Sequence, residues 1–387
     1  MFHTADPDDI KAGRITDVYF ERTLAVLKAR NLNKRVKAEL VAKSFPNGWP
    51  WAVIAGIEEA AELLKGLNIS VRAMWEGEVF YPYQPVIEIE GDYADFGAYE
   101  TALLGLICQA SGIATRAARF KKLADYRPVM SFGARRMHPA LAPMIERNAY
   151  IGGCDGVSVG KGAELIDSVP IGTMPHSLVI LMGDTVEAMR AYDEVVDPMV
   201  KRTALIDTFN DEKFEAVRVA EAMGETLYSV RLDTPASRRG DFYRILEEVR
   251  WELDLRGFKR VKLFVSGGIN EEDLPRLNPM VDAYGIGTAI SNAPVVDFAM
   301  DIVEVDGEPL AKRGKWSGSK SVLRCSECGR DTVALRTLGS WRCRCGGEMR
   351  DLLTPFMEGG RLVRELPAAK DIREKVLVNL SYLPDMG

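Results

Sequence analysis

Short apolar runs alternate with longer amphipathic segments through the middle of the chain. Between residues 116 and 300 the runs are rich in Val, Ile and Leu, and nearly every run ends in a glycine or a polar residue. Short apolar runs bounded by turn residues are typical of buried strands. Their alternation with helical segments indicates parallel strands joined by helical crossovers. The predicted strands are Val129–Phe132, Val157–Val159, Leu178–Met182, Ala204–Asp207, Leu227–Arg231, Lys262–Val265 and Ala283–Ile286.

The first 115 residues have a mixed pattern that predicts an α+β domain. The expected helices are Thr16–Arg30 with Thr16 or Asp17 at its cap, Trp51–Leu64, and a third helix capped by Asp95 that carries Tyr99–Ile107. The expected strands are Leu40–Phe45, Val71–Met74 and Val86–Ile89. Helices are also expected near 271–277 and 289–300, after the last two apolar runs.

The pattern changes again after residue 300. Asp301–Pro309 alternates like a strand around an Asp-Gly turn, and the basic segment 311–320 is expected to be flexible. We expect an N-terminal domain over 1–115, completed by parts of 301–320 and 361–387, with the last segment helical or irregular. A catalytic domain is expected over 116–300, and a small cysteine module over 321–360.

Composition restricts the class of protein. The chain has 387 residues, of which 47% are hydrophobic and 27% charged, as in ordinary globular proteins. Its net charge of −6 argues against a general nucleic-acid binder. No apolar run approaches the roughly 18 residues that span a membrane, and the acidic start is unlike a signal peptide. We therefore expect a cytoplasmic protein.

Four of the six cysteines are clustered with a spacing typical of a metal site. Cys325 and Cys328 form one close pair, and Cys343 and Cys345 form a second pair after fourteen intervening residues. Four thiolates in two pairs suit tetrahedral Zn²⁺, and a four-cysteine site is coordinatively closed, so it is structural. Free thiols or a redox pair are the alternative. Nearby arginines would also fit a nucleic-acid partner, but a surface arginine is more often simply solvated.

Two glycine turns follow consecutive predicted strands. The first is Ser266-Gly267-Gly268 and the second is Gly285-Ile286-Gly287-Thr288. Glycine lets the backbone approach a ligand closely, and the N-terminus of a following helix can hold a phosphate. Two such turns in succession resemble the phosphate end of a β/α barrel. Two tight turns without a ligand are the alternative.

Phe132 and a pair of arginines follow another predicted strand. A ring beside Arg135 and Arg136 would suit a flat anionic substrate, because guanidinium binds carboxylate or phosphate in a fork geometry. A basic rim beside a core Phe is the alternative.

Two aspartates and a histidine also stand near strand ends. Asp207 and Asp233 each follow an apolar run, where a carboxylate can accept sugar hydroxyls or coordinate Mg²⁺. Either one could equally cap the next helix. His176 lies among turn residues, and a lone histidine on spacing alone is more often a structural hydrogen-bonding group.

These motifs together resemble nicotinate phosphoribosyltransferase, in the short archaeal form of this type II phosphoribosyltransferase family. The motifs that carry the resemblance are Asp17–Tyr19, Tyr99–Thr101, Ser131–Arg136, Gly152–Ser158, Gly172–His176, Leu205–Thr208, Arg231–Asp233, Ser266–Gly268, Gly285–Thr288 and the cysteine module. The resemblance implies an irregular α/β barrel with an α+β N-terminal domain. It also implies the reaction of nicotinate with phosphoribosyl pyrophosphate to give nicotinate mononucleotide and pyrophosphate, in NAD salvage.

The resemblance assigns residues to the base. Phe132 would stack on one face of the pyridine ring, and Tyr19 from a neighbouring subunit would cover the other face. Arg231 would contact the carboxylate, with Arg135 close to the substrate. Ser158 stands where a nicotinamide-using relative has an Asp, and a neutral Ser is consistent with an anionic base.

It also assigns residues to phosphoribosyl pyrophosphate. Asp207 and Asp233 would face the ribose and Mg²⁺-pyrophosphate. The 5′-phosphate would be bound by Gly267, Gly268, Gly287 and Thr288. His176 matches the histidine that larger members phosphorylate from ATP, although Pro175 departs from many relatives and no Walker-type ATP loop is present. ATP coupling is therefore an expectation that comes from the family alone.

Two alternative functions stay open at this point. Quinolinate phosphoribosyltransferase shares the fold, but the length, the His176 motif and the cysteine module argue against it. A phosphate- or RNA-binding protein on an inactive barrel would use the zinc module instead. Because Tyr19 is expected to cross an interface, the resemblance also implies a homo-oligomer that is at least a dimer, and no nucleic-acid or membrane partner.

Overall fold

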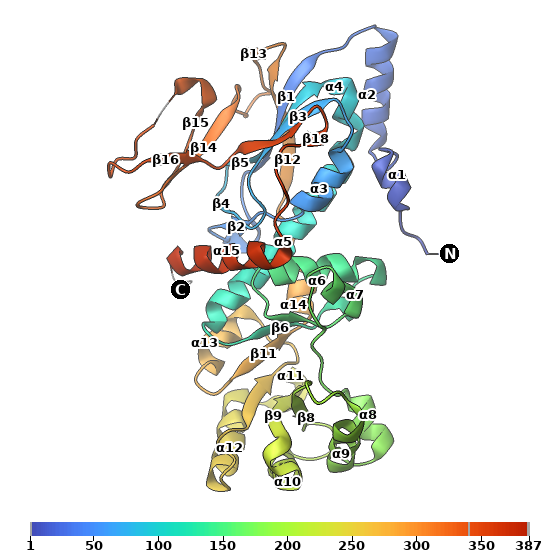
Figure 1. The fold of residues 1–387 in the computed structure, drawn as a ribbon, viewed down its shortest axis with the longest axis vertical. Coiled ribbons are helices and arrows are strands. Elements are labelled where there is room, and N and C mark those ends of the chain that lie inside the picture. The colour runs from blue at the N-terminus through green and yellow to red at the C-terminus, as the bar shows by residue number, and fades with distance from the viewer. Residues whose placement is uncertain (1, 340, 385–387) are drawn as a thin grey trace. The chain divides into compact units, whose positions relative to one another are not determined.

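Residues 2–339 and 341–384 are described by the computed structural model, and they form two compact units (Figure 1). Of the described residues, the first unit contains those up to Thr115 and those of the segment Pro294–Asn379, and the second contains Arg116–Ala293 with residues 380–384. The last residues of the C-terminal segment that we expected to be helical or irregular, 385–387, lie outside the described part. No described helix combines the length and the apolar character needed to cross a membrane.

A seven-stranded antiparallel sheet forms the centre of the first unit, in the order β13-β12-β1-β5-β3-β17-β18. The strands are β1 Arg35–Ala42, β3 Ile69–Ala73, β5 Pro85–Asp92, β12 Phe298–Val305, β13 Glu308–Pro309, β17 Thr354–Glu358 and β18 Arg361–Leu362. A short ladder joins β2 Ala52–Val53 to β4 Val79–Phe80. The strand pair β1–β12 therefore joins two segments that are far apart in the sequence.

Helices supply the rest of the core of this unit. They are α1 Pro7–Lys11, α2 Val18–Ala29, α3 Ile57–Leu64, α4 Tyr93–Phe96, the start of α5 Glu100–Ala124, and α15 Ala369–Tyr382. α3 buries Ile57, Ala61 and Leu64, which recur at helical spacing. These side chains pack with Leu40 and Ile89 of the sheet in one apolar core.

The cysteine segment forms a separate three-stranded antiparallel sheet of β14 Lys320–Cys325, β15 Asp331–Leu335 and β16 Met349–Asp351. Its first residue, Lys320, is buried and forms an ion pair with Glu39 of β1 at 2.8 Å. The end of the segment 311–320 is therefore fixed, and the expectation of flexibility is wrong there because a buried charge requires a partner.

The second unit is built on six parallel strands in the order β7-β6-β11-β10-β9-β8. The strands are β6 Val129–Ser131, β7 Gly156–Val157, β8 Arg202–Leu205, β9 Leu227–Leu232, β10 Lys262–Val265 and β11 Ala283–Ile286. This parallel half-barrel, the α+β N-terminal domain and the four-cysteine cluster confirm the fold class predicted from the sequence.

Helices connect the parallel strands. They are α6 Ala142–Ile151, α7 Gly160–Glu164, α8 His176–Met182, α9 Thr185–Val195, α10 Glu212–Met223, α11 Ala236–Arg239, α12 Phe242–Leu255, α13 Leu274–Leu277 and α14 Thr288–Ser291. α10 packs against α9 on one side and against α12 on the other. Asp184 and Asp211 cap α9 and α10 by accepting hydrogen bonds from backbone N–H groups of the first turn.

Several element predictions were wrong in detail. Leu178–Met182 lies in helix α8, where only Val179 is buried, and a central parallel strand would bury nearly every residue. The helix expected over 289–300 ends at Ser291, just before Pro294. Asp95 lies inside α4, which Asp92 precedes as the N-cap residue. Residues 52–53 form a strand, so the helix expected from Trp51 begins at Ile57.

Candidate active site

The carboxyl ends of the six parallel strands lie at one edge of the half-barrel, and polar residues follow most of the strands there. Parallel strands place their carboxyl ends on the same side of the sheet, where ligands bind in such folds. From β7 to β8, the residues that follow the strands are Ser158, Phe132, Gly287, Ser266, Asp233 and, two residues beyond β8, Asp207.

Arg231, near the end of β9, is held by three neighbours. Its Nε donates to the Ser266 hydroxyl at 2.9 Å, and Nη1 donates to the Thr173 hydroxyl at 2.8 Å. Nη2 lies 3.2 Å from Asp233 Oδ1, and the side chain is only 15% exposed. The guanidinium is therefore fixed in one orientation, and two of its five N–H bonds have no partner among the contacts of the described residues.

Phe132 provides an aromatic surface beside this guanidinium. The Arg231 Cζ atom lies 5.5 Å from the centre of the Phe132 ring, and Phe264 packs at a ring distance of 5.8 Å. A Cβ atom on Gly285 would lie 2.6 Å from Cδ2 of Phe132, so only glycine leaves room for the ring there. A ring and a cation are thus placed together at the carboxyl edge of β6 and β9.

His176 lies between the two rim aspartates. Its Nε2 is 3.7 Å from Asp207 Oδ2 and 3.6 Å from Asp233 Oδ2, and its Nδ1 is 3.0 Å from the Thr208 hydroxyl. Burial raises the pKa of Asp207; His176 opposes this rise, and the Asp233 carboxylate adds to it. Asp207 Oδ1 is buried without a hydrogen-bond partner among the described residues, so this oxygen has a lone pair that no described donor uses.

The first glycine turn takes a conformation that other residues rarely adopt. Gly267 has φ +85° and Gly268 has φ +71°, in the left-handed region. A Cβ atom on Gly267 would also lie 2.6 Å from the backbone oxygen of Asp233. Gly287 and Thr288 form the second turn, with Thr288 opening the short helix α14.

Ser158 is paired with a buried carboxylate. Its hydroxyl donates to Glu146 Oε1 at 2.8 Å, and its backbone N–H donates to the same oxygen at 3.0 Å. Val159 N–H donates to Glu146 Oε2 at 2.7 Å, and burial raises the pKa of Glu146 against these hydrogen bonds. Because Ser131 pairs with Val157, Ser158 and Phe132 begin adjacent turns.

Two of the expected substrate residues are not part of these contacts. Arg135 lies in a short 3₁₀ turn, Ala134–Arg136, and is exposed. Tyr19 belongs to α2 of the first unit and is 56% exposed. Both assignments therefore stay predictions.

Several residues in this site had no predicted role. Thr173, Thr208 and Ser266 belong to the quoted motifs, but only the structure shows that their hydroxyls hold Arg231 and His176. Glu146 was missed entirely, and an acid within an ordinary helical pattern gives no signal that it is buried.

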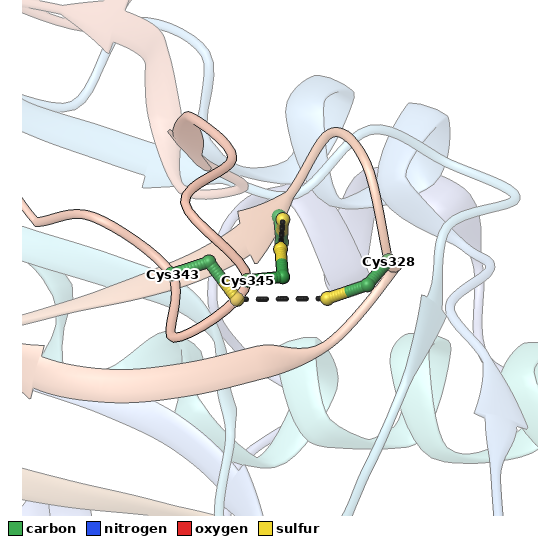
Figure 2. Close-up of side chains that lie close together, drawn as sticks. Cys328, Cys343 and Cys345 are labelled. Atoms are coloured by element: carbon green, nitrogen blue, oxygen red, sulfur yellow. Dashed lines mark hydrogen bonds between the residues drawn. The ribbon is translucent and has the colours of Figure 1, made fainter.

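The four cysteines of the C-terminal module converge (Figure 2). Their Sγ atoms all lie within 4.8 Å of one another, with Cys325–Cys345 and Cys328–Cys343 both at 3.5 Å. Sulfurs around tetrahedral zinc, with Zn–S of about 2.3 Å, are separated by about 3.8 Å. The cluster is therefore compatible with structural zinc.

Family models match most of both units. The C-terminal domain model of quinolinate phosphoribosyl transferase matches residues 113–301, and the N-terminal domain model matches residues 17–111. The chain belongs to the type II phosphoribosyltransferase family. It is a phosphoribosyltransferase of pyridine nucleotide synthesis.

Relatives of this phosphoribosyltransferase carry two kinds of name. A nicotinate phosphoribosyltransferase of Mycobacterium tuberculosis is 30% identical over 81% of this chain and 78% of its own length. The crystal structure of a nicotinate-nucleotide pyrophosphorylase from Pyrococcus furiosus has 54% identity, covers 98% of both chains and has a TM-score of 0.97. Human nicotinic acid phosphoribosyltransferase, at 20% identity and a TM-score of 0.76, shares the fold.

Proposed function

We propose that this phosphoribosyltransferase condenses nicotinate with phosphoribosyl pyrophosphate to give nicotinate mononucleotide and pyrophosphate. The observation that carries the proposal is the placement of Arg231 beside the Phe132 ring, with its guanidinium oriented by Ser266, Thr173 and Asp233. An aromatic surface with one oriented guanidinium matches a flat ring that bears one carboxylate. The nicotinate phosphoribosyltransferases among its relatives support the same base.

The base is bound by stacking and by one charged contact. Phe132 stacks on the pyridine ring, and the two free N–H bonds of Arg231 bind the carboxylate. Tyr19 from a second subunit covers the other ring face, while Ser158 and Arg135 line the edge of the site. Holding the ring nitrogen in line with C1 of the ribose converts an encounter between two substrates into a positioned reaction.

The phosphoribosyl group is held from the glycine turns and the aspartates. Backbone N–H groups at Gly267, Gly268, Gly287 and Thr288 bind the 5′-phosphate. Asp207 and Asp233 accept hydrogen bonds from ribose hydroxyls and provide the carboxylates for Mg²⁺. The unpartnered Asp207 Oδ1 fits such a cation. When bound, Mg²⁺ supplies positive charge to the leaving pyrophosphate.

His176 links the proposed reaction to ATP. If Nδ1 donates to Thr208, Nε2 carries the lone pair that a phosphoryl acceptor needs. The carboxylates of Asp207 and Asp233 lie on the Nε2 side, so phosphorylation there requires a cation to offset their charge. ATP coupling therefore depends on the same Mg²⁺ site as the transfer reaction.

The test is pyrophosphate release from phosphoribosyl pyrophosphate and Mg²⁺ with nicotinate, nicotinamide and quinolinate, each with and without ATP. We expect turnover with nicotinate alone among the bases. A rate or yield that rises with ATP would support coupling through His176, and that gain should vanish in His176→Ala. No turnover with nicotinate would exclude the proposal.

Quinolinate is the second candidate base. The matching family models describe quinolinate phosphoribosyl transferase domains, which is the observation that favours it. A second carboxylate would require a second oriented cation near Phe132, whereas Arg135 is exposed and outside the network that orients Arg231. Release of CO₂ with quinolinate would establish this alternative.

A further inference from the structure

Two arginines on α5 hold one carboxylate just beyond the first glycine turn. Arg116 and Arg119 are three residues apart, so they leave the helix on one face. Arg116 Nη1 donates to Glu271 Oε1 at 2.7 Å. Arg119 donates through Nε at 3.0 Å to both carboxylate oxygens and through Nη2 at 2.8 Å to Oε2. The three side chains are 13–17% exposed, so solvent weakens these contacts little.

Glu271 is three residues from Gly268, at the point where the turn after β10 ends. The turn is held at its other end as well, because Arg239 Nη1 donates to the Gly267 backbone oxygen at 2.9 Å. Asn270 and Asp273, on either side of Glu271, form a reciprocal capping box. The backbone on both sides of the glycine turn is therefore held by side-chain contacts, from Arg239 before it and from Arg116 and Arg119 after it.

We propose that Glu271, clamped by Arg116 and Arg119, is a positioning residue that keeps the Gly267–Gly268 turn in the conformation that binds the 5′-phosphate of phosphoribosyl pyrophosphate. This inference rests on the proposed function of that turn. Glycine loses more conformational freedom than other residues when it is fixed. A turn fixed before binding does not lose that freedom when the phosphate arrives, and preorganisation of this kind increases affinity.

The clamp also offsets an unfavourable charge. Glu271 is the first of three consecutive acidic residues, with Glu272 and Asp273, in the helical turn that follows the glycines. Carboxylates near an anion site repel phosphate. Of these three acidic residues, Glu271 is the nearest in sequence to the glycine turn. The guanidinium groups of Arg116 and Arg119 neutralise its carboxylate and hold its side chain against α5.

The experiment compares Arg119→Gln, Glu271→Gln and the double variant with the wild-type enzyme. We expect each single variant to raise the KM for phosphoribosyl pyrophosphate about tenfold, with kcat and the KM for the base within about twofold of wild type. The double variant should raise the KM for phosphoribosyl pyrophosphate no more than Arg119→Gln alone does, because the two residues act as one unit. Calorimetric titration with ribose 5-phosphate should show the same weakening without turnover.

Asp282→Asn is the matched control. Asp282 accepts hydrogen bonds from Lys262 Nζ and from the Leu263 N–H, each at 2.9 Å. It precedes β11, so it lies at the amino ends of β10 and β11, whereas the glycine turns lie at their carboxyl ends. This variant should lower the Tm but leave both KM values unchanged. The inference would be overturned if Arg119→Gln bound ribose 5-phosphate as tightly as wild type. It would also be overturned if the variant lowered kcat and raised both KM values to a similar extent. The proposed function would fail in a different way. In that case the wild-type enzyme would bind ribose 5-phosphate but would not use nicotinate as a substrate.

Discussion

Arg231 shows how one functional side chain depends on residues from neighbouring strands and loops. Ser266 follows β10, Asp233 follows β9 and Thr173 precedes α8, yet all three contact the same guanidinium. Ser266 also donates to Asp233 Oδ1 at 2.6 Å. Such a linked set restricts the rotamers of every member, and this is what a preorganised binding site requires.

Arg231→Ala should raise the KM for nicotinate strongly or abolish turnover. Hydrogen bonds to a charged group contribute about 1.5–3 kcal/mol, so kcat/KM should fall roughly 10- to 150-fold. Arg190→Ala is the control, because Arg190 is 55% exposed in an ion pair on α9. Steady-state kinetics with varied nicotinate check the prediction, and wild-type kinetics in Arg231→Ala would remove this residue from the site.

Glu100 should make the stability of the protein depend on pH. Burial, with Asp301 adding to the effect and Lys312 opposing it, raises the pKa of Glu100 from 4.5 to about 7. The folded state therefore holds a proton that the unfolded chain has released, so this contribution is complete below pH 4.5 and is lost as the pH rises through 7.

Glu100→Gln should remove this loss of stability at high pH, because glutamine does not ionise. The variant should match wild type near pH 4 and exceed it at pH 8, by about 1 kcal/mol after allowance for solvent screening. Thermal unfolding at the two pH values measures the difference. Equal pH dependence in both proteins would mean that Glu100 titrates normally.

Among the elements, the three-stranded cysteine sheet is the one whose stability should depend on a metal. Cys325 ends β14, and its three partner cysteines lie in the loops that follow β14 and precede β16. We expect about one zinc per chain, and Cys325→Ser should lower both the zinc content and the Tm, because structural zinc stabilises the fold that binds it. Cys108→Ser should keep its zinc. Unchanged metal content in Cys325→Ser would exclude the zinc site.

The sequence predicted strands better than it predicted the contacts between them. β9, β10 and β11 were located because their apolar runs end in glycine or charged residues. Leu178–Met182 has the same composition but forms a helix with one buried residue, since a short apolar run does not by itself distinguish strand from helix. The Thr173–Arg231 and Glu146–Ser158 hydrogen bonds were not predicted, because both depend on how separate elements pack against each other.

At the scale of the whole molecule, the first unit combines the N-terminal part of the chain with the segment Pro294–Asn379. β12 pairs with β1, and β17 pairs with β3, so residues after 294 complete a sheet begun before residue 115. The change of pattern after residue 300 predicted a return of the chain to this domain. It gave no information on which strands pair, because strand register depends on the three-dimensional match of buried faces.

Tyr19 provides a test of the assembled enzyme, because it belongs to the first unit while Phe132 and Arg231 belong to the second. Tyr19→Ala and Arg231→Ala should each have much lower kcat/KM than wild type when assayed alone. If Tyr19 acts across a two-fold interface, a mixed dimer has one site with both changes and one site with neither. Mixing equal amounts under conditions that allow subunit exchange should therefore restore about a quarter of the wild-type sites. No recovery despite demonstrated exchange would show that each chain builds its own site.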